Sequence, residues 1–241
     1  MTFIEGKSVA EAFEELKFAY ESGVNFFDNS ESYGETSQGW VRGGVSEVIM
    51  GQAVQLGIKQ KLWARMDLVI STKLMWGGRG TLDTPNSVGL SRKHLIEGMH
   101  ASLERMQLDY VDLVFCHRPD SRTPIWETCR AMNFLIDQGL AFYWGTSEWS
   151  EAQLAEAMHV CDKHNLIPPL FEQCEYSVSI ASRLCLSSLS SIVRCLPSFV
   201  SRLVSLSICL HQSGLTVYLA GCARSDARSP HHRVGANALL P

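Results

Sequence analysis

The sequence predicts an α/β fold in which parallel strands alternate with covering helices. Short apolar runs recur along residues 1–177, and helix-length amphipathic segments separate them. Each run ends in polar or charged side chains: Asp28, Lys73, His117, Ser147-Glu148 and Gln173. Five polar strand ends in succession indicate one shared rim, and no Gly-x-Gly-x-x-Gly follows a strand to support an open dinucleotide-binding sheet. We therefore predict an incomplete (β/α)8 (TIM) barrel with about five recognisable strands.

The first elements follow from local signals. Ser8-Val-Ala-Glu11 is a capping-box pattern that opens a helix ending at Gly23. The apolar run of residues 24–27 is the first expected strand, and a long loop over residues 33–44 follows it. A helix is expected over residues 47–56, with Gly57 as its stop.

The later elements repeat the alternation of strand and helix. Ser150-Glu-Ala-Gln153 is a second capping-box pattern, and Pro124 suits the first position of a helix. A Gly-rich connection, residues 76–80, follows the second strand. The expected strands span residues 67–72, 110–116, 141–146 and 169–172, and the expected helices span residues 91–106, 124–139 and 150–163.

Composition excludes several classes of function. The 241 residues are 46% hydrophobic, which is enough for one sizeable core. A formal charge of -4 gives no reason to expect nucleic acid or an anionic membrane surface as partner. The eight cysteines lack metal-ligand spacing, so we expect no metal site, and with no secretory leader they indicate a reduced, cytoplasmic setting.

Residues 178–241 differ in character from residues 1–177. They hold one acidic residue, Asp226, and six arginines, with no lysine or glutamate. Arg194, Pro197 and Arg202 interrupt their most apolar stretch, so no membrane-spanning helix is expected. We predict a barrel portion at 1–177 and a divergent or disordered tail at 178–241, which lacks a strand or helix pattern and is not expected to supply a strand to the sheet.

Four residues at the predicted strand ends suit the reduction of a carbonyl group. Tyr33 is a candidate proton donor, although the ordinary pKa of a tyrosine is about 10. An ammonium group nearby, from Lys73, lowers such a pKa, and Asp28 can hold that ammonium in place. His117 can donate a hydrogen bond that orients the carbonyl. Each of these residues, taken alone, could instead have a purely structural role, such as a loop cap or a solvated strand end.

The chain resembles the aldo-keto reductase superfamily, and within it the branch that contains the voltage-gated potassium channel beta subunits. The similarity runs from about Thr2 to Tyr176. The matching stretches are residues 27–34, 70–73, 76–78, 89–98, 102–112, 118–120, 143–149, 165–169 and 172–176.

The resemblance implies specific site residues. Asp28, Tyr33, Lys73 and His117 match the family's catalytic tetrad. The positions that hold NADP(H) are matched by Asp28, Ser147, Glu148 and Gln173. Animal channel subunits carry Asn at the position of His117, so histidine favours catalysis. The expected partner is then a small carbonyl compound.

Two alternatives remain open from the sequence. The chain could be a cytoplasmic regulatory protein that binds a voltage-gated potassium channel alpha subunit, and the resemblance to channel subunits then implies a homo-oligomer. It could also be an inactive truncated product, because the family's seventh and eighth strands have no counterpart in residues 178–241.

Overall fold

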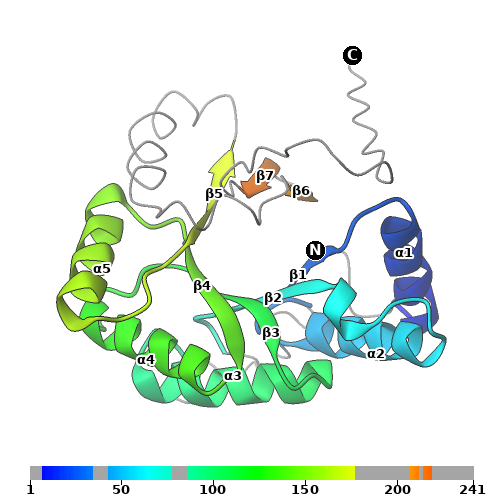
Figure 1. Ribbon diagram of the computed structural model, residues 1–241, viewed down its shortest axis with the longest axis horizontal. Helices are drawn as coiled ribbons and strands as arrows, with labels where there is room; N and C mark the ends of the chain where they lie inside the picture. Colours follow the sequence, from blue (N-terminus) through cyan, green and yellow to red (C-terminus); the bar gives the residue numbers. More distant parts are fainter. Residues whose placement is uncertain (1–6, 35–42, 78–85, 177–206, 212–213, 219–241) are drawn as a thin grey trace, which may run out of the picture.

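The computed structural model describes residues 7–34, 43–77, 86–176, 207–211 and 214–218 (Figure 1). Five strands run parallel as neighbours in the order β1-β2-β3-β4-β5, and the sheet curls into a half-barrel. This confirms the predicted incomplete (β/α)8 barrel. The strands are β1 (Phe26–Asp28), β2 (Val69–Leu74), β3 (Val111–Cys116), β4 (Ala141–Ser147) and β5 (Phe171–Tyr176).

Five helices cover the convex side of the sheet (Figure 1). Both predicted capping boxes are present, at Ser8 with Glu11 and at Ser150 with Gln153. The helices are α1 (Val9–Glu21), α2 (Val45–Lys59), α3 (Arg92–Met106), α4 (Ile125–Asp137) and α5 (Glu151–His164), and a short 3-10 turn, η2 (Arg65–Asp67), precedes β2.

Gly57 does not end α2, contrary to the sequence-based expectation. The helix continues to Lys59, and a Cβ atom at Gly57 would lie 2.2 Å from the ring of Trp63. The glycine therefore serves close packing and not termination. Residues 35–42 and 78–85, which include most of the two Gly-rich loops, lie outside the described residues.

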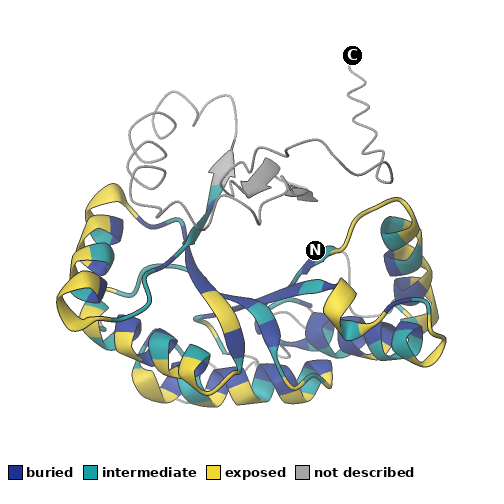
Figure 2. Cartoon of the chain, viewed as in Figure 1, coloured by how far each residue is buried: buried dark blue, intermediate teal, exposed yellow. Residues whose placement is uncertain are grey.

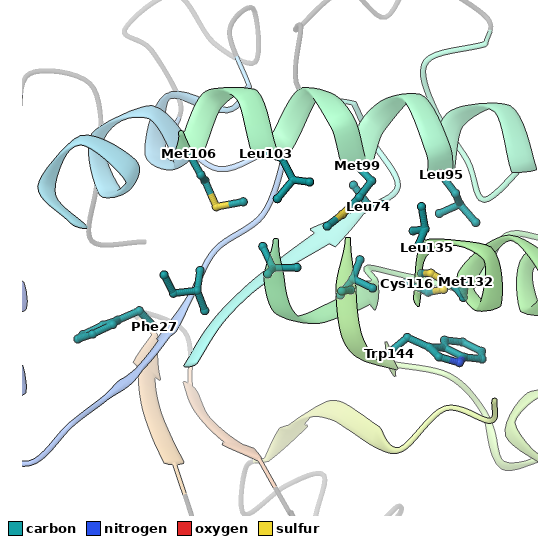
Figure 3. Close-up of a cluster of buried hydrophobic side chains, with 14 of the residues drawn as sticks. Phe27, Leu74, Leu95, Met99, Leu103, Met106, Cys116, Met132, Leu135 and Trp144 are labelled. Carbon is teal, nitrogen blue, oxygen red and sulfur yellow. The ribbon is translucent and has the colours of Figure 1, made fainter. Parts of the chain in front are cut away.

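The main hydrophobic core lies between the sheet and its helices (Figures 2 and 3). Trp144, Leu74 and Cys116 contribute from the strands, and Met99 and Met132 from α3 and α4. A second, smaller cluster of Leu113 and Phe115 lies apart from it, with Phe26, Val69 and Phe171 packed around them. Strand register places this second cluster on the opposite, concave face of the sheet.

Two further strands come from the region that we predicted to be a strandless tail, so that expectation is wrong. Strand β7 (Gly214–Tyr218) pairs antiparallel with β5, and β6 (Ser207–His211) pairs antiparallel with β7. The sequence does carry the signal: Ile208 and Leu210, then Leu215 and Val217, alternate with other residues on either side of a two-residue connection. The other residues of 177–241 lie outside the described part of the chain.

Candidate active site

Strand register assembles the predicted site residues on the concave face. Asp28 is paired with Ser71, and Lys73 with Phe115. Ser147 is paired with Gln173. Because side chains alternate along a strand, all of these residues point to one face, near the carboxyl ends of their strands.

Lys73 and Asp28 form a buried ion pair at the centre of the site. The Lys73 side chain is 0% exposed, and its Nζ donates to Asp28 Oδ2 and, at 2.8 Å, to the carbonyl oxygen of Asn29. Ser71 Oγ also donates to Asp28. Burial lowers the pKa of Lys73, but the charges of Asp28 and Tyr33 outweigh it, so the pKa is raised. Lys73 therefore remains an ammonium.

Tyr33 lies beside this ion pair. Its ring centroid is 4.6 Å from Lys73 Nζ, and its amide donates to the carbonyl oxygen of Ser30 at 3.1 Å. Burial raises the pKa of Tyr33; the Lys73 ammonium opposes this effect without reversing it. Sequence reasoning considered only the ammonium. In the structure, desolvation is the larger effect, and Tyr33 is held in its protonated form.

His117 directly follows β3 and is buried next to Tyr33. The two ring centroids are 5.5 Å apart, with the rings nearly perpendicular. Burial, followed by the charges of Lys73 and Arg118, lowers the pKa of His117 to about 2, so the imidazole is neutral. Its Nδ1 lies 3.0 Å from Ser30 Oγ. A neutral ring in this place can exchange hydrogen bonds but carries no charge.

Ser147 of β4 and Gln173 of β5 extend the site from the other side of the half-barrel toward Asp28. Ser147 Oγ donates to the carbonyl oxygen of Gln173 at 2.8 Å, and Gln173 Nε2 lies 3.4 Å from Asp28 Oδ2. The first and fifth parallel strands therefore meet through side chains. Glu148 follows with a φ of 58°, a left-handed conformation in which its amide donates to the Gln173 carbonyl oxygen.

Sequence reasoning missed four residues that line or support the site. Ser30 contacts His117, and Arg118 Nη1 donates to Ser147 Oγ at 3.0 Å. The ring of Trp76 lies 4.5 Å from that of His117. Glu31 is completely buried in the turn that leads to Tyr33. No periodicity distinguishes these residues; three of the four adjoin predicted site residues or lie between them, and that adjacency is the only sequence signal.

Glu172 lies on the other face of β5 from Gln173. Thr146 Oγ1 donates to its carboxylate, and so does the amide of Trp149 at 3.2 Å. Burial raises the pKa of Glu172 to about 7, and these hydrogen bonds oppose that rise only in part. This carboxyl group therefore titrates near neutral pH, close to the site but outside it.

The described residues contain neither a candidate metal site nor a candidate membrane-spanning helix. Within the described ranges, no group of three or more His, Cys, Asp or Glu side chains could hold a metal ion. Among those same residues, no helix has both the length and the apolar character that crossing a bilayer requires.

Comparison with known proteins gives consistent matches. The model of the Aldo/keto reductase family matches residues 2–189. The chain is 50% identical over 179 residues to a "Probable voltage-gated potassium channel subunit beta" of Oryza sativa subsp. japonica, and 51% identical to a protein of the same name from Arabidopsis thaliana. Each match covers 74% of this chain and 49% of the relative. The chain thus spans about half the length of the curated relatives it matches.

Proposed function

This chain belongs to the aldo/keto reductase family, and from that premise we propose that it reduces the carbonyl group of a small aldehyde or ketone with NADP(H). The observation that supports the proposal most is the contact of the partly buried phenol of Tyr33 with the ion pair of the buried Lys73 and the partly buried Asp28. Such a group is suited to giving one proton to an oxygen that is gaining negative charge.

Tyr33 is the proposed proton donor. The raised pKa of Tyr33 keeps its phenol protonated until negative charge develops on the carbonyl oxygen, which then accepts the proton. The phenolate that forms is stabilised by Lys73, whose ammonium faces the ring. Asp28 keeps Lys73 charged and fixed.

His117 is proposed to orient the carbonyl. When Ser30 Oγ donates to its Nδ1, the ring proton resides on Nε2, which can then donate to a substrate oxygen. Because the ring is neutral at all ordinary pH values, its part is hydrogen bonding and not proton transfer.

The rim residues fit the nicotinamide end of NADP(H). The nicotinamide carboxamide offers a donating NH2 group and an accepting carbonyl oxygen, and the Gln173 carboxamide is its chemical complement. Gln173 is nearly buried, and among the described residues the hydrogen bond of its Nε2 is a long one, 3.4 Å to Asp28, which a stronger partner could replace. Ser147, Glu148 and Asp28 would complete this site. The bound cofactor would supply the hydride.

NADPH binding followed by fluorescence, together with a carbonyl-reduction assay, tests the proposal. We expect the full chain to bind NADPH and Tyr33→Phe to bind it equally well, because the lost hydroxyl lies at the reaction centre. Reduction should fall at least about 100-fold in Tyr33→Phe, the usual contribution of a positioned proton donor. A chain that binds no NADPH would instead favour an inactive product, and reduction that survives in Tyr33→Phe would remove Tyr33 from the role.

A second candidate function is regulation of a potassium channel. The observation in its favour is the 50% identity to proteins named as probable voltage-gated potassium channel beta subunits. Co-purification with the cytoplasmic part of a channel alpha subunit, using wild type and Tyr33→Phe in parallel, tests it. Binding by both proteins, without reduction by either, would favour regulation over catalysis.

A further inference from the structure

Glu31 occupies an unusual position behind the site. It lies in the turn between Asp28 and Tyr33, is 0% exposed, and its amide donates to the Lys73 carbonyl oxygen at 3.1 Å. A carboxylate buried to this degree is costly unless its oxygens are hydrogen-bonded. The partners of Glu31 therefore indicate what it does.

One carboxylate oxygen of Glu31 holds the loop that follows β2. Its Oε1 accepts from the amide of Met75 at 2.6 Å and from the amide of Gly77 at 2.9 Å. These two amides lie on either side of Trp76. The backbone of Trp76 is therefore fixed at both of its ends by a residue from the Tyr33 turn.

Helix α3 supports the same carboxylate from behind. His94 Nε2 lies 3.1 Å from Glu31 Oε1. A Cβ atom at Gly98 would come within 3.1 Å of Glu31 Oε2, so the absence of a side chain there leaves room for the carboxylate. Oε2 itself has no hydrogen-bond partner among the described residues. An unpaired buried oxygen costs stability, so stability alone does not account for this arrangement.

The Trp76 side chain extends from this anchored backbone into the site. Its ring lies 4.5 Å from the ring of His117 and 5.8 Å from the guanidinium carbon of Arg118, while 43% of the residue remains exposed. Trp76 thus places a partly exposed aromatic side chain directly beside the group proposed to orient the carbonyl.

We propose that Glu31 is a positioning residue that fixes Trp76 against His117, so that the indole ring forms a wall for the planar, apolar part of an aromatic carbonyl substrate. The inference rests on the proposed reductase function. Glu31 itself touches no reacting atom in this scheme. It acts through the backbone of Trp76 and couples the loop after β2 to the turn that carries Tyr33.

The kinetic test compares an aromatic aldehyde with a short aliphatic aldehyde. In Glu31→Ala we expect KM for the aromatic aldehyde to rise at least about tenfold, the equivalent of one charge-assisted hydrogen bond, with a much smaller rise for the aliphatic one. Glu31→Gln retains an acceptor oxygen for the two amides and should restore most of the loss. Adding Trp76→Ala to Glu31→Ala should cost little more, because the two residues act as one unit. Equal effects on both aldehydes, or fully additive losses, would overturn the proposal.

A second measurement does not depend on activity. Amide hydrogen exchange at Met75 and Gly77 should accelerate about tenfold or more in Glu31→Ala, while Glu31→Gln and the surface control Glu97→Ala leave it unchanged. If wild type reduces no aldehyde, the proposed function fails, yet exchange still decides whether Glu31 holds the loop. Should Glu31→Ala not fold, His94→Leu, which removes only the hydrogen bond from α3, should show the same acceleration to a smaller degree. Unchanged exchange in the folded variants would exclude the positioning role.

Discussion

The charge of Lys73 is shielded from solvent, so Lys73 and Asp28 each depend on the other for compensation of their charge. Its side chain is 0% exposed and that of Asp28 is 11% exposed. Removing one member of a buried pair leaves the other as an uncompensated charge, which costs more than the pair contributes. The pair therefore has separable effects on folding and on chemistry.

We predict that Lys73→Met lowers the free energy of unfolding by about 3–5 kcal/mol, because Asp28 is left buried without its partner. The double variant Asp28→Asn/Lys73→Met should recover much of that stability and none of the carbonyl reduction. Chemical denaturation measured alongside the reductase assay distinguishes the two effects. A double variant as unstable as Lys73→Met would show that Asp28 is not the unpaired charge.

His117 makes stability depend on pH. Its pKa is about 2 in the folded protein and near 6.5 in the unfolded chain, so the unfolded state binds more protons as pH falls below 6.5. The free energy of unfolding should then fall by up to about 1.4 kcal/mol for each pH unit. We expect His117→Asn to remove this contribution when denaturation is measured at pH 7, 6 and 5.

Glu172 provides the matched comparison, because its effect has the opposite sign. Its pKa of about 7 lies above that of the unfolded chain, so its contribution is present below about pH 4.5 and is lost as pH rises through 7. The two groups partly offset one another in wild type. Glu172→Gln should therefore steepen the loss of stability on acidification, while His117→Asn should reverse it. Identical pH profiles for wild type and His117→Asn would contradict the assignment of His117 as a buried neutral base.

At this scale the sequence predicts which residues meet, and it does not predict their electrostatics. Asp28, Lys73 and Gln173 end up together because each ends an apolar run, and strand ends share an edge. The direction of the Tyr33 pKa depends on burial, which no single residue reveals. Glu31 and Trp76 are also beyond sequence reasoning, since their relation consists of hydrogen bonds from the backbone amides on either side of Trp76 to the Glu31 carboxylate.

Among the elements, α2 and α3 pack unusually closely. A Cβ atom at Gly51 would lie 2.3 Å from the carbonyl oxygen of Met106, which belongs to the backbone and has little freedom to move. Gly57 makes a comparable approach to the ring of Trp63. Glycine inside a helix normally weakens the helix. At these two positions that cost is accepted because only glycine allows the close contacts with Met106 and Trp63.

We predict that Gly51→Ala lowers the free energy of unfolding by about 1–3 kcal/mol through overpacking, despite the better helix propensity of alanine. Gln52→Ala, at the exposed neighbouring position, should be neutral or slightly stabilising. Thermal or denaturant unfolding of both variants measures the difference. An equally stable Gly51→Ala protein would mean that the two helices can separate at little cost.

Local signals predict the starts of the helices better than their ends. Both capping boxes were identifiable because they need only residues three positions apart. The predicted end of α2 at Gly57 was wrong, because this position requires glycine for close tertiary packing against Trp63 and not for ending the helix. Strands β6 and β7 escape prediction because their alternating pattern is short and lies within the unusual Ser/Leu/Arg/Cys composition of residues 178–241.

In the described part of the chain the sheet has seven strands, five parallel and two antiparallel, and its edges are β1 and β6. Strand β7 covers the edge of β5 that would otherwise be open. Exposed edges readily pair with other chains. Strand β7 thus covers this edge of the half-barrel without continuing its parallel order.

We predict that a chain ending at residue 176 aggregates more readily than the full chain, because β5 then presents an unpaired edge. Light scattering and size-exclusion chromatography at matched concentrations provide the measurement. A shortened protein as monodisperse as the full one would show that β7 gives no protection in solution.

The hydrogen bond between Gln173 and Asp28 joins residues 145 positions apart. Contacts of such long sequence separation form late, because the intervening chain must be ordered first. During synthesis, Asp28, Tyr33 and Lys73 leave the ribosome long before Gln173 exists. A nascent chain can therefore assemble the ammonium–phenol pair early, but it gains the opposite wall of the site only after its fifth parallel strand has been translated.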